Sequence, residues 1–109
     1  MAYAEISLGQ AQVQDAATTI HTVPASTTAI LRDMMICNVD SSAHTVTVWL
    51  DPDGTTATDA TAIIDAFSIP ANDFIHWTGL QVMAATATLK AIADADNVIT
   101  ITAAGIHVT

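Results

Sequence analysis

Three aspartates in the stretch WLDPDGTTATD are the residues of this sequence whose types and spacing best suit chemistry. Asp51, Asp53 and Asp59 are candidate ligands for Ca²⁺, a cation that takes about six to eight oxygen ligands. Their spacing does not match an EF-hand loop, because a proline separates the first two aspartates and an alanine occupies the twelfth position. Asp-Pro-Asp-Gly is also typical of a tight turn. We therefore expect a turn and a surface loop here, and we keep the three aspartates as the first place to look for a bound cation.

The four histidines are the other potential metal ligands, but their spacing does not predict a site. They are distributed along the whole chain, and no two stand in H-x-H or H-x-x-x-H spacing: His21, His44, His76 and His107. In a symmetric oligomer, one histidine from each subunit could meet the others at the axis. Assembly would then respond to pH near 6 to 7, at about the ordinary pKa of the imidazole.

No motif for catalysis or for a cofactor is present in the sequence. It contains no G-x-S-x-G motif and no phosphate-binding loop, and Glu5 is its only glutamate. Cys37 is the single cysteine and lies in an apolar run, which is typical of a core residue. We expect a protein without enzymatic activity and without a cofactor.

The composition excludes two classes of partner. Eleven acidic residues against two basic ones give a formal charge of -9, which repels a nucleic-acid backbone and an anionic lipid surface. No apolar run approaches the roughly 20 residues of a membrane span, and the N-terminus lacks the features of a signal peptide. We therefore expect no nucleic acid and no membrane as partners, and synthesis in the cytoplasm.

Alternation of apolar and polar residues predicts an all-β chain. In HTVTVWL, Val46 and Val48 share one face of a strand while Thr45 and Thr47 share the other, and NVITITAAGIHV repeats this pattern. TTAILRDMMICN predicts a long strand with apolar residues on both faces, which lies either centrally in a sheet or at a contact between subunits. Further strands are expected at ISL, TTIHTV, TAIIDAFSI, DFIHWT, LQVM and ATLKAIA, with Gly79 as a separator and a bulge at Gly105.

About eight such strands at intervals of about ten residues predict an antiparallel β-sandwich of jelly-roll type. Residues 57–67 and 84–95 could instead form short helices, as their composition allows. Neither segment, however, has apolar residues repeating at the helical period of about 3.6 residues. The chain is long enough for a single domain. We assign residues 17–109 to the sandwich and residues 1–16 to an N-terminal edge strand with an arm that lies along a neighbour; a frayed terminus is the alternative for residues 1–16.

Contacts with a partner are expected from large apolar side chains at strand ends and in the N-terminal segment. Trp49 and Trp77 each end a predicted strand, and tryptophan is enriched at interfaces. The alternative for the tryptophans is that both close the ends of the sandwich. In the N-terminal segment, the candidate contact residues are Tyr3, Ile6 and Leu8.

Four segments together resemble a family of small phage virion proteins with a β-sandwich fold. They are ISLGQAQV, TTIHTVPASTTAILRDMMICNVDSSAHTVTVWLDPDGTT, IPANDFIHWTGLQV and the ending NVITITAAGIHV. The resemblance covers nearly the full length, and its motifs describe architecture without chemistry. The sequence departs from the family pattern at Arg32 and Asp33 within a strand and at His21.

The resemblance implies a capsid decoration, or cement, protein. Such a protein would bind the major capsid protein on the outside of the virion as a homo-oligomer, with a trimer expected, and would stabilise the shell. The alternative that the resemblance leaves open is a tail or fibre knob that binds a receptor or a carbohydrate, with the aspartate loop and the tryptophans as its site.

Overall fold

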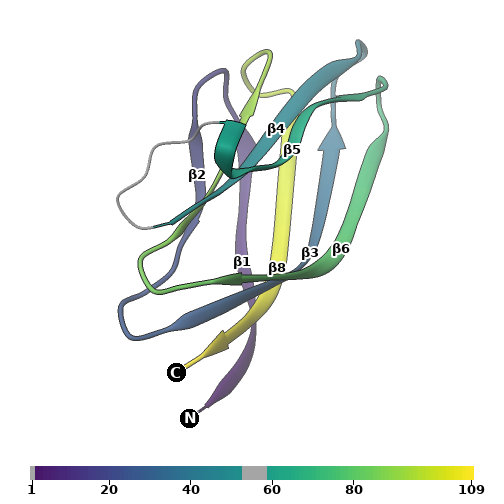
Figure 1. Cartoon of the computed structure of the whole chain (residues 1–109). Helices are drawn as coiled ribbons and strands as arrows, with labels where there is room; N and C mark the ends of the chain where they lie inside the picture. Colours follow the sequence, from purple (N-terminus) through teal and green to yellow (C-terminus); the bar gives the residue numbers. More distant parts are fainter. Residues whose placement is uncertain (1, 53–58) are drawn as a thin grey trace.

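Eight strands form two four-stranded antiparallel sheets in the computed structural model, which describes residues 2–52 and 59–109 (Figure 1). The two sheets have the strand orders β1-β8-β3-β6 and β2-β7-β4-β5. The strands are β1 (Tyr3–Val13), β2 (Thr18–Thr22), β3 (Thr28–Asn38), β4 (His44–Asp51), β5 (Ala62–Ile69), β6 (Phe74–Met83), β7 (Thr88–Ala93) and β8 (Ile99–Val108), and one 3-10 turn, η1 (Asp59–Thr61), precedes β5.

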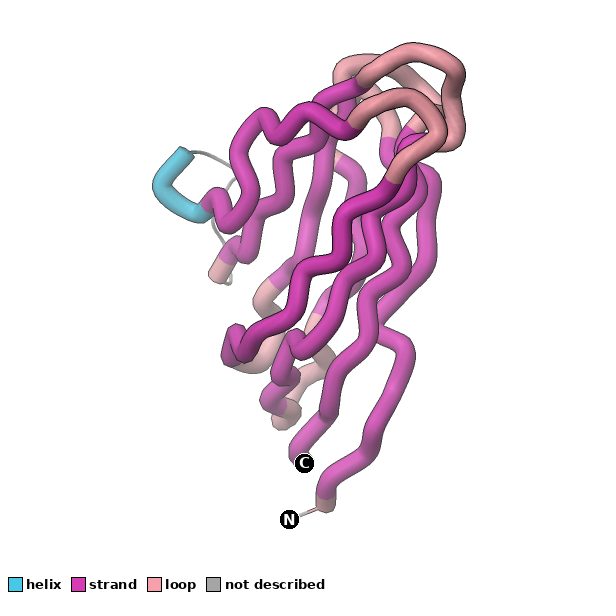
Figure 2. Tube along the Cα trace, turned by 90° about the vertical axis from the view of Figure 1, so that its right-hand side faces the viewer, coloured by secondary structure: helices cyan, strands magenta, loops and turns pink. Residues whose placement is uncertain are grey.

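This strand order is that of a jelly roll, which confirms the predicted fold class. β4 pairs with β5, β3 with β6, β2 with β7 and β1 with β8, so the chain resembles one long hairpin rolled into two sheets. Figure 2 shows the strands along the length of the molecule, with loops gathered at its ends and η1 outside the sheets. Within the described part of the chain, no helix has the length and apolar character of a membrane span.

The core lies between the two sheets and is built from the faces that the alternation predicts. Val46 and Val48 of β4 are buried, as are Ile99 and Ile101 of β8, while the threonines between them are not. The N-terminal segment takes part as well, because β1 pairs with β8 over most of its length. Residues 3–13 therefore form an edge strand of the sandwich.

A bulge in β3 changes which face its residues occupy. The register with β8 shifts between Leu31 and Asp33, so Arg32 is an extra residue on this strand. Leu31 is consequently buried together with Met34 and Ile36, although simple alternation places Leu31 on the opposite face from them. The prediction of a central strand is confirmed, since β3 lies between β8 and β6.

The structure differs from the sequence-based predictions at two glycines, Gly79 and Gly105. Gly79 does not separate two strands, because β6 runs through it from Phe74 to Met83. The ring of Trp77 lies beside Gly79, where an added Cβ would come within 3.0 Å of that ring. The bulges near Gly105 lie in its partner strands, at Leu8 and Arg32, rather than in β8.

Neither alternative helix is present in the described residues. The stretch 84–95 contains β7 and its flanking turns, and 57–67 contributes only η1 and β5 to the part of the chain that is described. Strand pairing explains this result: β7 lies between β2 and β4, where its backbone groups bond on both sides. Tertiary pairing therefore outweighs the helical preference of its alanines.

Candidate functional site

Asp51, the first of the three loop aspartates, is buried at the end of β4. Its side chain is fully enclosed, Lys90 Nζ lies 3.4 Å from its Oδ2, and the Thr61 hydroxyl donates a hydrogen bond to its Oδ1. No hydrogen bond from the described residues reaches Oδ2, so Lys90 on neighbouring β7 supplies the balancing charge. The buried Asp51 carboxylate on β4 therefore contacts β7 through Lys90 and η1 through Thr61.

The rest of the predicted cation loop is not described. Asp53 lies outside the described residues, and Asp59 lies in η1 with a side chain of which nothing is described. Among residues 2–52 and 59–109, no three His, Cys, Asp or Glu side chains gather as a metal site. The Ca²⁺ hypothesis thus stays a prediction.

His44 contacts two carboxylates at the end of the sandwich where β4 begins. Its Nε2 lies 2.7 Å from Asp40 Oδ2 and its Nδ1 lies 2.7 Å from Asp94 Oδ1. The hydrogen bond with Asp40 and then that with Asp94 raise the pKa of His44, because both stabilise the imidazolium. In return, the His44 hydrogen bond, followed by one from the Ser41 backbone, lowers the pKa of Asp40. This triad ties the β3–β4 loop to the β7–β8 loop.

Asn38 supports the same end of the sandwich from inside. Its side chain is fully buried, and its amide nitrogen donates to the carbonyls of Ser42, Ile69 and Pro70 at 2.8 to 3.2 Å. Its Oδ1 accepts a hydrogen bond from the Asp40 backbone. A buried amide with all these partners fixes the loop that carries Asp40, and so it positions the His44 triad.

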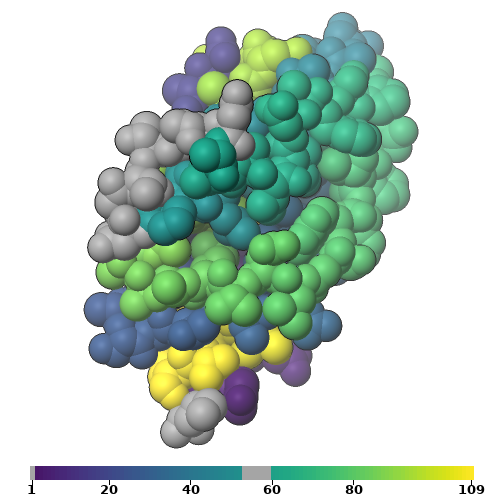
Figure 3. All heavy atoms as spheres, in the orientation of Figure 1, coloured from purple at the N-terminus to yellow at the C-terminus, as the bar shows by residue number. Residues whose placement is uncertain are grey.

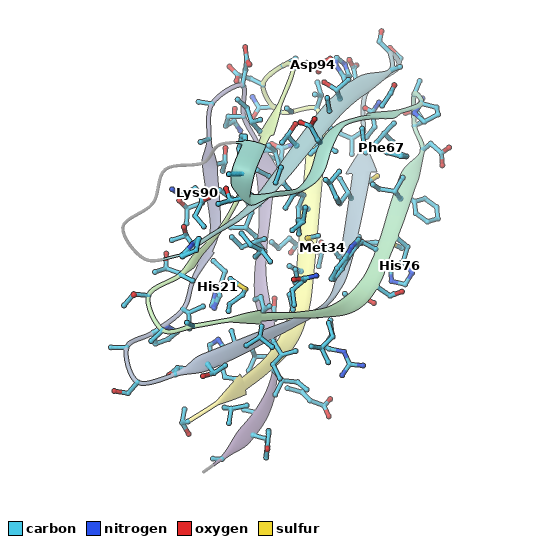
Figure 4. All side chains as sticks on the ribbon, viewed as in Figure 1. His21, Met34, Phe67, His76, Lys90 and Asp94 are labelled. Atoms are coloured by element: carbon cyan, nitrogen blue, oxygen red, sulfur yellow. The ribbon has the colours of Figure 1, made fainter. Side chains whose placement is uncertain are left out.

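His21 and His107 meet between the two sheets, near the other end of the molecule. Their Nε2 atoms are 3.1 Å apart, with ring centroids separated by 5.2 Å. Burial lowers the pKa of His21, and the nearby His107 lowers it further, whereas a backbone hydrogen bond with Leu8 acts in the opposite direction. Figure 4 shows His21 well separated from Asp94 along the length of the molecule. Sequence spacing gave no sign of this pair, because 86 residues separate its members.

Apolar side chains are exposed along one edge of the sandwich. Figure 3 shows β5 in teal and β6 in green as one continuous surface. Four side chains on these strands are about half or more exposed, and we call them the apolar edge: Phe67 47%, Phe74 54%, Leu80 58% and Val82 63%. β5 and β6 are also the last of the described strands in their sheets, so each has one row of backbone groups without a neighbouring strand among the described residues. Sequence reasoning missed this edge because its apolar residues do not form one periodic run.

The predicted contact residues are spread over the molecule. Tyr3 is exposed, Ile6 is half-buried against the core, and Leu8 is buried with an exposure of 2%, so Leu8 belongs to the core and not to an outer surface. Trp49 on β4 and Trp77 on β6 are half-buried and lie in different sheets. None of these five residues belongs to the apolar edge.

A hollow of about 590 Å³ lies on the sheet β1-β8-β3-β6. It is lined by small side chains such as Ser7, Thr102 and Ala104, with Glu5 and Arg32 as its charged groups. Arg32 Nε donates to the Gly79 carbonyl at 3.1 Å, which directs the arginine toward β6. No aromatic side chain lines this hollow, so it lacks the flat platform that stacks on a sugar ring.

Comparison with known proteins gives a likeness in fold. No family model matches the chain, and no curated protein matches it. A chain in the solved structure titled "Structure of infectious bursal disease virus Gx strain" superposes with a TM-score of 0.55 over 97% of this chain, at 11% sequence identity. The match covers 32% of that longer viral chain, so this protein spans about a third of its length. At this identity the likeness shows a shared β-sandwich.

Proposed function

We propose that this chain is a structural protein of a phage virion, without enzymatic activity, that decorates the outside of the capsid as a homo-oligomer. The observation that carries the proposal is the apolar edge on a jelly-roll sandwich, a rigid scaffold with an adhesive side. The chain of similar fold belongs to a virus structure, and the sequence resembles small phage virion proteins. The major capsid protein is the proposed partner, and a trimer is the proposed assembly.

The apolar edge has the properties of a contact between subunits. Exposed strands β5 and β6 offer unpaired backbone groups beside large apolar side chains, and an association that covers both satisfies the backbone and removes apolar surface from water. Stable interfaces bury about 1,600 Å² in total. Identical subunits assemble most readily with closed symmetry, and several weak contacts of a trimer with a lattice add up to firm binding.

The net charge of -9 suits a protein displayed on a particle surface. Like charges on neighbouring particles repel one another and keep the particles dispersed. Within an oligomer, the same repulsion has to be outweighed by apolar contact. The apolar edge provides that contact, so the subunit interface lies there in the proposed assembly.

Sedimentation tests the interface directly. Leu80→Asp and Val82→Asp place a charge within the apolar edge, and we expect the oligomer to dissociate to monomers that keep the wild-type far-UV circular dichroism. Thr19→Asp adds the same charge at an exposed position of β2 and serves as the control, with no change in assembly expected. A wild-type chain that sediments as a monomer at high concentration contradicts the interface.

Electron cryomicroscopy of the particle that contains the protein tests its place in the virion. We expect density for the sandwich on the outer face of the head lattice. Density confined to the tail or fibre tips contradicts the decoration role and favours the receptor-binding knob instead. Addition of the purified protein to particles that lack it is the complementary measurement, with an increase in the capsid melting temperature expected.

A further inference from the structure

The two sheets of the sandwich are joined at one margin by a pair of imidazoles. His21 lies on β2 and pairs with Leu89, a fully buried residue of β7, so His21 is on the inner face of its sheet. His107 continues the inward series of β8 that contains Ile101, Ala103 and Gly105. The rings therefore face each other across the space between the sheets.

Only small side chains neighbour His107 along the sheet. The strand neighbours of His107 are Ala4 on β1 and Ala29 on β3, so small side chains flank the ring on both sides. Both histidines are half-buried, which keeps them accessible from the surface. By contrast, both ring nitrogens of His44 contact carboxylates, those of Asp40 and Asp94, and Nε2 of His76 contacts Asp33 at 2.7 Å.

The separation of the two Nε2 atoms matches that of two ligands of one metal ion. Bonds from imidazole nitrogen to Zn²⁺ are about 2.0 to 2.1 Å long, so two nitrogens on one ion stand about 2.9 Å apart at a right angle and about 3.3 Å apart at the tetrahedral angle. The observed 3.1 Å lies between these values. Binding of one ion by both nitrogens therefore requires little change in the distance between them.

We propose that His21 and His107 form a binding site for a divalent transition-metal ion of the zinc, copper or nickel type, which clips β2 to β8. Imidazole nitrogen is a preferred ligand of these ions, and the net charge of the chain attracts cations. Water completes the coordination, because no third His, Cys, Asp or Glu joins the pair among the described residues. Neutral rings that only share a hydrogen bond are the competing arrangement.

Thermal unfolding of the full chain with Zn²⁺, Ni²⁺ or Cu²⁺ in excess tests the site. An ion that binds only the folded chain stabilises it, and we expect the melting temperature to rise by about 5 °C and to return to its starting value on addition of a chelator. His21→Gln and His107→Gln should each abolish the rise. His76→Gln also removes one imidazole but leaves the pair intact, so it should keep the full rise.

Electron paramagnetic resonance of the Cu²⁺ complex tests the ligands independently of stability. We expect hyperfine coupling to two imidazole nitrogens in the wild-type protein and to one in each of the two variants. A spectrum with at most one nitrogen in the wild type overturns the proposal even if a variant fails to fold. An equal rise in melting temperature in all variants also overturns it, because binding then occurs at the other histidines.

Discussion

His44 is the residue at which the structure responds most directly to pH. Its imidazolium accepts no hydrogen bond itself but donates one to Asp40 and one to Asp94, and these bonds raise its pKa above the ordinary value of 6.5. A raised pKa means that the folded state binds the proton more tightly than the unfolded state does. The stabilisation is therefore fully present below pH 6.5 and is lost as the pH rises through the raised pKa.

We predict a matching pH dependence of the free energy of unfolding. Between pH 6 and pH 9 it should fall in the wild-type protein, because the His44 proton is lost, and His44→Gln should flatten this part of the profile. Urea unfolding at a series of pH values is the measurement. His76→Gln is the control, since its partner Asp33 lies on an exposed part of the sheet. An unchanged slope in His44→Gln would show that the triad does not carry the effect.

Lys90 is the second residue whose replacement should be costly. Lys90→Met leaves the Asp51 carboxylate buried without its balancing charge, and we predict a loss of about 3 kcal/mol in the free energy of unfolding. The double variant Lys90→Met with Asp51→Asn should recover part of that loss, because a neutral amide can still accept the Thr61 hydrogen bond. Chemical denaturation measures both, and a double variant no more stable than Lys90→Met would contradict the ion-pair interpretation.

At the scale of the strands, close packing of β8 against β3 depends on a missing side chain. A Cβ added at Gly105 would lie 2.0 Å from the backbone oxygen of Ile30 and 2.9 Å from Leu8 Cδ1. The backbone of β3 cannot move away without disturbing the ladder that it forms with β8. The backbone of β3 beside the bulge at Arg32 therefore approaches β8 as closely as it does because residue 105 is a glycine.

Gly105→Ala should destabilise the protein by about 3 kcal/mol, the upper part of the usual range for overpacking. Gly79→Ala is the matched control within a strand, because its Cβ would meet only the side chain of Trp77, at 3.0 Å. We expect a smaller loss there, since a ring at the sheet edge can shift. Thermal unfolding of the two variants compares them, and equal losses would argue against the close approach of β3 and β8.

At the scale of the whole molecule, the N-terminal strand closes one side of the sandwich. β1 pairs only with β8 in its sheet, yet it contributes Leu8 and Val13 to the core. Removing it would expose an edge of β8 and part of the apolar interior. If the segment were instead a detachable arm that contacts a neighbouring subunit, its removal would expose neither the edge of β8 nor the apolar interior.

Deletion of residues 1–13 should therefore abolish cooperative unfolding and not merely weaken assembly. Near-UV circular dichroism and a thermal melt measure this result. Deletion of residues 1–2 is the control, because Ala2 contributes two backbone hydrogen bonds with Thr109 at the end of the sheet but no core side chain. If the truncated chain melts cooperatively near the wild-type temperature, residues 1–13 are an arm and not a required strand of the sandwich.

The sequence by itself determined the class of fold and most of the strands. Alternation at Val46 and Val48, and again at Ile99 and Ile101, is a local property of a strand with one buried face, so it can be read without knowledge of the partners. The prediction of a separator at Gly79 is wrong, because a glycine that lies beside a tryptophan ring within a strand looks the same in sequence as a glycine in a turn.

Only the tertiary structure decided which residues meet. The contact of His21 with His107, of His44 with Asp94 and of Asp51 with Lys90 each joins different strands or loops, and none has a signature in local spacing. The shift of face at Arg32 likewise depends on how β3 pairs with β8. The physical reason is that periodicity reports whether a residue faces the core, whereas strand pairing over long separations determines its neighbours.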